Sequence, residues 1–235
     1  MRKIITLSII MGVMLATTSM GFAQGAKTAD ELKAERQQLK TELKSKDAQK
    51  TAKSLDKVAP VGGTMADVVA VFASGLPAPL QPAVASVKKL VGDKEARIIN
   101  KPAATGLNSV DGLCDAGTTL LGVVVSTNAI LQEYKIAITE SKDGEVDISK
   151  FKANSDDYMA ILPMLVQAGV DAAKAVEKIK DVQADVKGLN PMQAAPTIKA
   201  ANWAMDAVNV SVAKIGENTK LLQNLINGIK ASKNL

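Results

Sequence analysis

Hydrophobic positions recur at alternating spacings of three and four residues along three stretches of this chain. The first stretch runs from Val110 to Leu131, the second from Tyr158 to Val186 and the third from Ile198 to Ile229. This spacing places apolar side chains on one face of an α-helix, and such a face is stable only when it is buried. Three such helices can bury their faces by packing against one another in an antiparallel arrangement. The pattern therefore predicts an all-α fold, an up-down helical bundle.

Two shorter helices are expected ahead of the first long one. Thr64 can cap a helix that runs to about Ser74, and a second helix spans Leu80 to Val91. The residues from Gly92 to Gly106 are expected to form a connection. We therefore expect a bundle domain, residues 60–235, of about three long and two short helices, with the short helices closing the bundle.

A charged segment, residues 24–59, precedes this domain. Thr28 and Glu31 form a capping box, the pattern that starts a helix, and this helix extends from about Ala29 to Val58. Its own Lys, Asp, Glu and Gln side chains occupy almost every side of this helix. A helix that is polar nearly all round projects into solvent or pairs through a narrow seam. We therefore predict a charged N-terminal helix that forms a solvated, partly detached arm.

Two features of the sequence are candidate contacts with a partner. Leu32, Leu39 and Leu43 form one short seam of the coiled-coil type in the charged helix. Trp203 is the single tryptophan, and its ring can anchor an interface or lie at a membrane boundary. For Trp203 a position in the core or at its edge is the preferred interpretation, and the interface or membrane anchor is the alternative. These four residues are the predicted partner contact.

Turn and cap residues predict where the long helices begin and end. Asp143 and Gly144 form a turn after the first long helix, and Ser155 is the predicted N-cap of the second. Gly188 ends the second helix, and Pro191 occupies the first turn of the third.

Residues 1–23 have the features of a secretory signal peptide. Arg2 and Lys3 precede the apolar run Ile4–Leu15, and small residues lead to the end of the segment at Gly21–Ala23. A charged start, an apolar core and small residues before the cleavage point are what the export machinery reads. We therefore expect an exported protein of a bacterial envelope, in the first place periplasmic, with secretion or the cell surface left open.

Composition restricts the chemistry that we expect. The chain has no histidine and one cysteine, so the commonest general base and metal ligand is missing. It has 29 basic and 24 acidic residues, and cleavage of the leader removes two of the basic ones. The remaining lysines are interleaved with acidic residues, whereas nucleic-acid-binding domains concentrate basic residues on one face. We therefore expect no catalysis, no cofactor, no metal and no nucleic-acid partner.

Three further groups of residues have a structural and a chemical interpretation. Cys114 is expected to be a small buried side chain, with an intermolecular disulfide or a reactive thiol as the alternative. Asp143, Glu145 and Asp147 lack the full calcium-loop pattern, so a solvated turn is preferred over a cation site. A row of asparagines on the last helix is expected to form its solvated face: Asn202, Asn209, Asn218, Asn224 and Asn227.

The leading functional hypothesis is a non-enzymatic, exported helical bundle that binds another protein or an envelope component through its helical surface and charged arm. The alternative is a membrane-active, pore-forming-like secreted protein, because Ala116 to Leu131 form an apolar run rich in small residues. That run is shorter than the roughly 20 residues of a membrane span, so a buried central helix is preferred and membrane contact is not favoured. Either hypothesis is compatible with a homo-oligomer. An enzyme that uses lysine, serine or carboxylates is a third hypothesis, and no motif supports it.

Overall fold

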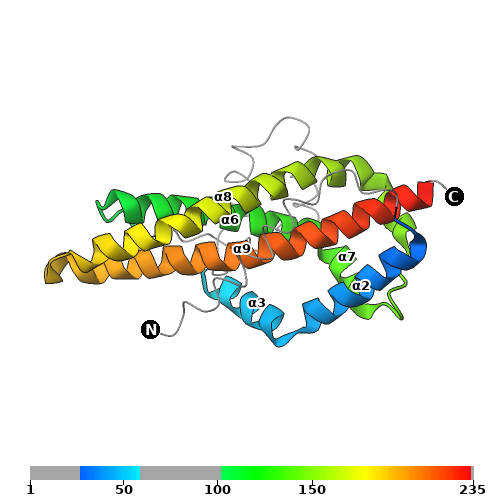
Figure 1. Ribbon diagram of the computed structural model, residues 1–235, viewed down its shortest axis with the longest axis horizontal. Helices are drawn as coiled ribbons and strands as arrows, with labels where there is room; N and C mark the ends of the chain where they lie inside the picture. Colours follow the sequence, from blue (N-terminus) through cyan, green and yellow to red (C-terminus); the bar gives the residue numbers. More distant parts are fainter. Residues whose placement is uncertain (1–26, 59–101, 234–235) are drawn as a thin grey trace, which may run out of the picture.

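The computed structural model describes residues 27–58 and 102–233, and every regular element in these two ranges is helical (Figure 1). The elements are α2 (Ala29–Lys44), α3 (Lys46–Val58), α6 (Asn108–Ile130), α7 (Gln132–Glu140), the 3₁₀ helix η2 (Ile148–Asn154), α8 (Ser155–Lys187) and α9 (Pro191–Lys233). No strand occurs among the residues of these ranges. The prediction of an all-α helical bundle is confirmed.

Some of the predictions concern residues outside the described ranges. The signal peptide at residues 1–23, the domain boundary at residue 60, and the short helices at 64–74 and 80–91 all lie there. They stay predictions, and the fold is described through α2, α3 and the helices that follow residue 102.

The long helices α6, α8 and α9 lie side by side along the longest axis of the molecule (Figure 1). Near the start of α9, the Sδ atom of Met205 lies 3.6 Å from Nε2 of Gln183 in α8. Further along α9, Ile215 lies against Gly169 of α8. Because the contacts move backward along α8 as they move forward along α9, these two helices are antiparallel.

The helices α6 and α9 run in the same direction, so the three long helices are not all antiparallel to one another. Gly117 of α6 packs on Ala207 of α9, and a Cβ atom at Gly117 would lie 3.1 Å from that of Ala207. Further along both helices, Nδ2 of Asn218 donates a hydrogen bond of 2.7 Å to Oγ1 of Thr127. The parallel pair follows from chain order, since α8 returns the chain to the end at which α6 began.

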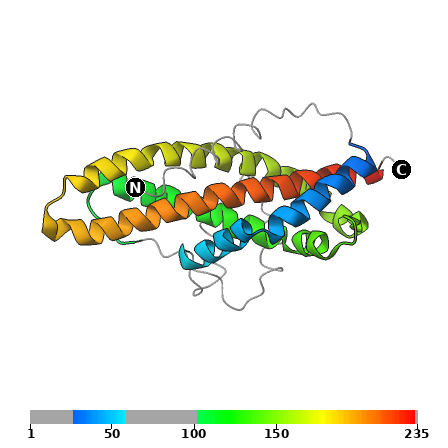
Figure 2. The same ribbon diagram turned by 60° about the horizontal axis from the view of Figure 1, so that its bottom comes forward.

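The centre of the described structure is α9, because α2, α3, α6 and α8 all pack on it (Figure 2). Between Ala207 and Ile229, buried side chains occur on all its sides. The fully or almost fully buried apolar residues there are Ala207, Val208, Ile215, Leu221, Leu222, Leu225 and Ile229. The second half of α6 is similar, since no side chain from Leu120 to Asn128 is exposed. The preferred interpretation of this run as a buried helix is confirmed, whereas the one-sided stripe predicted for α9 underestimates its burial.

Several predicted helix boundaries are confirmed. The hydroxyl of Thr28 accepts a hydrogen bond of 3.3 Å from the backbone N–H of Glu31, and the Glu31 carboxylate accepts one of 2.7 Å from the backbone N–H of Thr28. Asp143 and Gly144 form a turn in which both residues have positive φ, 54° and 74°. The helix α9 begins at Pro191 as predicted.

Two boundaries differ from the prediction. The N-cap of α8 is Asn154 and not Ser155, because a 3₁₀ helix leads directly into it. The turn at Asp143 is predicted to follow the first long helix directly, but α6 ends at Ile130, and Leu131 has φ −91° and ψ 1°. The chain bends by 57° between α6 and α7. This bend allows α7 to bury Tyr134 and Ile138 as a separate element.

The charged N-terminal helix is not a detached arm, so that prediction is wrong. It breaks at Ser45, where the backbone is extended with φ −66° and ψ 156°, and both halves pack on α9 (Figure 2). Leu55 and Val58 of α3 are only 6% and 3% exposed. The break lets the few apolar residues of each half face the bundle, and the charged residues find partners there. We call α2 and α3 together the strap.

Candidate functional site

The predicted leucine seam of α2 faces the bundle of the same chain. Leu32 and Leu39 are 2% and 6% exposed, and Leu43 is half-buried against the core. They lie in the helix that packs on α7 and α9. The narrow seam therefore exists, but Leu32 and Leu39 are not surface residues, and the expectation of an external partner there does not hold for them.

Trp203 lies at the edge of the core. Its side chain is half-buried and packs against core residues. A Cβ atom at Gly117 of α6 would lie 3.7 Å from Cζ3 of Trp203, so the small residue makes room for the ring. The structure does not bring Trp203 together with the leucine seam of α2, which packs near Asn224 in the other half of α9.

A buried polar cluster lies between the strap and the bundle, and it consists of Arg36 in α2, Tyr134 in α7 and Asn224 in α9. Their exposed fractions are 7%, 1% and 2%. Nε of Arg36 donates to Oδ1 of Asn224 over 3.0 Å and to the Tyr134 hydroxyl over 3.3 Å. The Tyr134 hydroxyl donates to the same Asn224 oxygen over 2.5 Å. Hydrogen bonds thus connect α2, α7 and α9 at one point, where the guanidinium of Arg36 is buried.

The amide nitrogen of Asn224 completes this polar cluster. Its Nδ2 donates to the backbone oxygen of Leu32 over 3.3 Å and to the carboxylate of Glu35 over 3.0 Å. One asparagine therefore accepts from two groups and donates to two others, which uses the full capacity of a side-chain amide. Because buried polar groups are costly when left without partners, this residue specifies how the strap docks.

The space at Gly228 and the protonation state of Tyr134 both suit the Arg36 side chain. Gly228 of α9 lacks the Cβ atom that would lie 2.8 Å from Nη2 of Arg36. Burial raises the pKa of the Tyr134 phenol to about 12, although the nearby Arg36 acts in the opposite direction. Tyr134 is therefore a neutral hydroxyl across the physiological pH range, able to accept from Arg36 while it donates to Asn224.

Ion pairs surround this cluster at the rim of the strap. Nζ of Lys33 lies 2.8 Å from the carboxylate of Glu145, and Nζ of Lys220 lies 3.0 Å from that of Glu42. Each of these side chains is at least one-third exposed, and exposed pairs contribute little to stability in water. The main determinants of docking are therefore the buried leucines and the polar cluster, while the rim supplies charge complementarity.

A second group of charges lies between α7 and α9. The carboxylate of Glu217 accepts from Nζ of Lys135 over 2.6 Å and from Nζ of Lys214 over 2.9 Å, and Lys214 is 3% exposed. Burial acts to raise the pKa of Glu217, but the two lysines outweigh it and lower this pKa below its usual range. Burial lowers the pKa of Lys214. A buried lysine of this kind can act as a nucleophile when a cavity adjoins it, but here its partner is a carboxylate within the helix packing.

Cys114, Glu145 and Asp147, for which the sequence allowed a chemical as well as a structural role, have structural partners. Cys114 is buried, and its Sγ lies 3.7 Å from the backbone oxygen of Ala200. Glu145 pairs with Lys33, and Asp147 caps η2 by accepting from the backbone N–H of Ser149 over 3.0 Å. Among the described residues no group of three or more acidic or cysteine side chains is placed to hold a metal ion.

One side of α8 carries apolar side chains that the other described helices leave partly or largely exposed. We define the apolar stripe of α8 as Met159, Pro163, Val166 and Val170, which recur at the spacing of one helical face. Met159 is 39% exposed, Pro163 is exposed and the two valines are half-buried. The core-facing residues of α8 form a different set: Tyr158, Ile161, Leu165, Ala168, Ala172 and Ala175. This stripe is a candidate docking surface.

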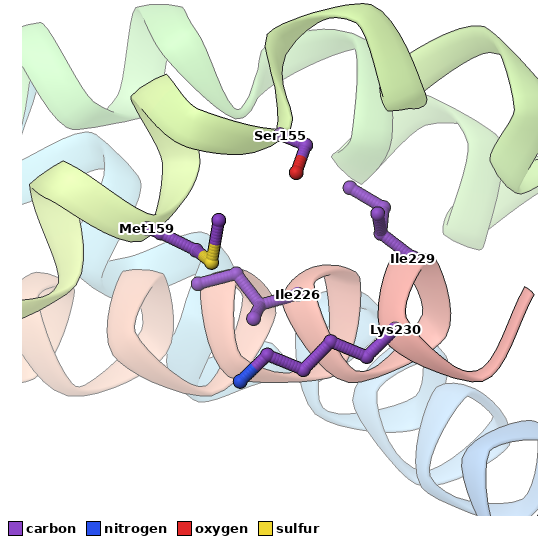
Figure 3. A pocket seen from close by; sticks show the side chains of 5 residues that line it. All are labelled: Ser155, Met159, Ile226, Ile229 and Lys230. Carbon is purple, nitrogen blue, oxygen red and sulfur yellow. The ribbon is translucent and has the colours of Figure 1, made fainter. Parts of the chain in front are cut away.

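A small hollow adjoins one end of the stripe (Figure 3). Its lining residues are Ser155 and Met159 of α8 and Ile226, Ile229 and Lys230 of α9. The volume is about 50 Å³, whereas pockets for small-molecule ligands have on the order of 300–1,000 Å³. The hollow is therefore a gap in the packing beside the stripe rather than a substrate pocket.

No family model, no curated protein and no solved structure matches this chain. The site must therefore be interpreted from its own geometry.

Reasoning from the sequence missed the polar cluster. It placed Asn218 and Asn224 on a solvated face, but these two are 1% and 2% exposed, whereas Asn202 and Asn209 are exposed. The available signal was Arg36, which lies between Leu32 and Leu39 on the same helical face. An arginine in the middle of an apolar seam indicates a polar partner in the opposing surface.

Proposed function

We propose that this chain is an exported, non-enzymatic helical-bundle protein of the bacterial envelope that acts by binding a protein or an envelope component. The observation that carries the proposal is the apolar stripe of α8. The features of a signal peptide at residues 1–23 support export. With the strap docked on its own bundle, the binding surface is assigned to α8 and not to the charged arm.

The stripe has the properties of a docking surface because apolar side chains recur along one side of a long helix. Complete burial of a methionine or valine side chain contributes roughly 1.5–3 kcal/mol, and these side chains are only partly buried. A partner that covers the stripe gains the rest of that contribution. Beyond the stripe the exposed side of α8 becomes charged at Lys174, Glu177 and Asp181, as at the polar rim of an interface.

Site-specific photo-crosslinking tests this proposal. A photoreactive residue placed at Val170 of the full chain is expected to crosslink one specific species in intact cells, identified by mass spectrometry. The same residue placed at Glu177, two turns further along α8, is the matched control and is expected to give little of that product.

A charge variant makes the test specific for the stripe. Val166→Lys is expected to reduce capture from position 170 by at least about tenfold, because a lysine in an apolar contact must be desolvated. Glu177→Lys introduces the same side chain outside the stripe, with a larger change of net charge (+2 against +1), and is expected to leave capture unchanged. Equal capture from both positions, or capture that survives Val166→Lys, would contradict the proposal.

A membrane-active, pore-forming-like protein is the second candidate, and a specific observation favours it. The stretch Ile148–Lys187, which contains η2 and α8, is long and apolar enough to cross a membrane. Only 28% of its most apolar window is buried, whereas a core helix of a bundle hides most of its apolar surface. Lipid can therefore replace a protein as the cover of the stripe.

Dye release from vesicles separates the two candidates. For the binding protein we expect no leakage from vesicles of phosphatidylethanolamine and phosphatidylglycerol between pH 5 and pH 8. Leakage that Val166→Lys abolishes and Glu177→Lys leaves intact would favour the membrane-active candidate over the protein-binding one.

A further inference from the structure

The surface of α7 and α9 on which α2 docks, which we call the groove, recognises a definite helical pattern. On α2, Leu32, Arg36 and Leu39 lie at positions i, i+4 and i+7, which is one face of the helix. The leucines enter the apolar part of the groove, and the guanidinium enters a recess formed by Tyr134 and Asn224. The absent Cβ of Gly228 provides the space for it. The groove therefore selects an amphipathic helix with an arginine between two leucines.

Undocking exposes buried groups on both the strap and the groove. On the strap, Leu32 and Leu39 are 2% and 6% exposed in the docked state, and Arg36 is 7% exposed. The groove contains the almost fully buried Tyr134 and Asn224, whose hydrogen bonds to the strap are lost on undocking. A strap and a groove that have separated are therefore both expected to dock again with a partner of the same pattern.

The chain connection allows a second copy to supply that helix. Residues 59–101 join the strap to the rest of the bundle. A fully extended chain of that length reaches on the order of 140 Å at about 3.3 Å per residue. The 43 residues of α9 span roughly 65 Å at about 1.5 Å per residue. We propose that the strap of one copy docks in the groove of a second copy, so that two chains exchange straps.

Exchange preserves the contacts of the strap, because each groove receives the same sequence as before. What changes is the entropy of association, so the exchanged form depends on protein concentration. In dilute solution the strap of the same chain occupies the groove, since covalent attachment gives it a high effective concentration. The exchanged pair therefore accumulates at high protein concentration. This inference is independent of the proposed binding by α8.

A mixing experiment tests the exchange directly. In a Cys114→Ser background, one full chain carries Lys33→Cys and the other carries Glu145→Cys, at positions whose native side chains are 2.8 Å apart. A short bismaleimide joins these two cysteines efficiently when the strap of one chain lies in the groove of the other, whereas random encounters of the two exposed positions give only the background that the control pair measures. A covalent dimer is expected, and its yield should rise with protein concentration. The control replaces Glu145→Cys by Lys174→Cys, on α8, and is expected to yield at least about tenfold less dimer.

The Arg36→Ala substitution is expected to have opposite effects on dimer yield, depending on which of the two chains carries it. In the chain with Lys33→Cys it weakens the strap that must dock, and the dimer yield is expected to fall on the order of tenfold. In the chain with Glu145→Cys it weakens the competing strap of the receiving chain, and the yield is expected to rise. A general folding defect would lower the yield in both cases. A dimer yield no higher than that of the control pair, or the same effect of Arg36→Ala in either chain, overturns the proposal.

Discussion

At the scale of single residues, the buried polar cluster decides how the strap meets the bundle. Arg36, Tyr134 and Asn224 come from three helices and share one amide oxygen. Apolar contacts alone would allow α2 to slide or rotate on α9, since they are not directional. Hydrogen bonds to a buried guanidinium are directional and costly to break, so they define a single register.

Loss of the Asn224 amide should therefore lower stability. We expect Asn224→Ala to decrease the free energy of unfolding by about 2–3 kcal/mol, because it leaves the buried Arg36 without its amide acceptor. Asn209→Ala, an exposed asparagine of the same helix, is the control and should change stability by less than about 0.5 kcal/mol. Urea denaturation followed by circular dichroism measures both. Equal effects of the two substitutions would show that the amide of Asn224 has no specific role.

The Tyr134 phenol predicts a dependence of stability on alkaline pH. Its pKa is raised from 10.0 to about 12 in the folded chain, so above pH 10 the unfolded chain loses a proton that the folded chain keeps. The stabilising difference is complete below pH 10 and is lost as the pH approaches 12. At pH 11 the free energy of unfolding should have fallen by about 1 kcal/mol from this group.

Tyr134→Phe isolates this contribution. Comparison of the variant with the native chain at pH 8, 10 and 11 should show a smaller decrease for the variant, by about 1 kcal/mol between pH 8 and pH 11. Tyr158, whose pKa burial also raises, is present in both chains and cancels in the comparison. Identical pH profiles would mean that Tyr134 ionises as easily in the folded chain as in the unfolded one.

At the scale of elements, the turn after α7 is built to receive the strap. Gly144 has φ 74°, a conformation that side chains rarely adopt, and a Cβ atom there would lie 2.6 Å from the backbone oxygen of Lys33. The turn and α2 therefore meet backbone to backbone. The neighbouring Glu145 is thereby held where it pairs with Lys33.

Substitution of this glycine should loosen the contact. We expect Gly144→Ala to lower the free energy of unfolding by about 1–3 kcal/mol, from backbone strain and the displaced strap. Gly112→Ala is the matched control, because no atom lies within 4 Å of a Cβ at this exposed position in α6. That substitution should raise stability by about 0.5–1 kcal/mol through helix propensity. Thermal denaturation of both variants measures the difference in sign.

At the scale of the whole molecule, α9 holds the other helices together, and the strap is the outermost layer. Side chains of α9 from Ala207 to Ile229 are mostly buried among the other described helices, whereas the strap has one side in solvent. Its rim contacts are exposed ion pairs, which are screened at high ionic strength. The strap should therefore open without unfolding of the bundle.

Hydrogen exchange measures this hierarchy. Amides of α2 should exchange at least about tenfold faster than those between Ala207 and Ile229 of α9. At 1 M salt, where charge interactions extend only about 3 Å, the exchange of α2 should accelerate while that of α9 stays the same. Equal protection of α2 and the centre of α9 would show that strap and bundle unfold as one unit.

Local physical chemistry made the helices predictable from the chain alone. The periodicity of apolar residues depends only on the geometry of the α-helix, and it located all three long helices. The capping box at Thr28 and the turn at Asp143 and Gly144 involve neighbours in sequence, and both are confirmed. These local patterns could not predict which helix would occupy the centre of the bundle.

The docked strap, the central position of α9 and the polar cluster arise from contacts between residues far apart in the chain. Arg36 is 98 positions from Tyr134 and 188 from Asn224. When each helix is considered alone, a charged helix is predicted to be solvated and an asparagine is predicted to be exposed. These predictions fail because the partner that compensates the burial of each polar group lies elsewhere in the sequence. Packing brings those partners together, and only then does burial of a polar face become favourable.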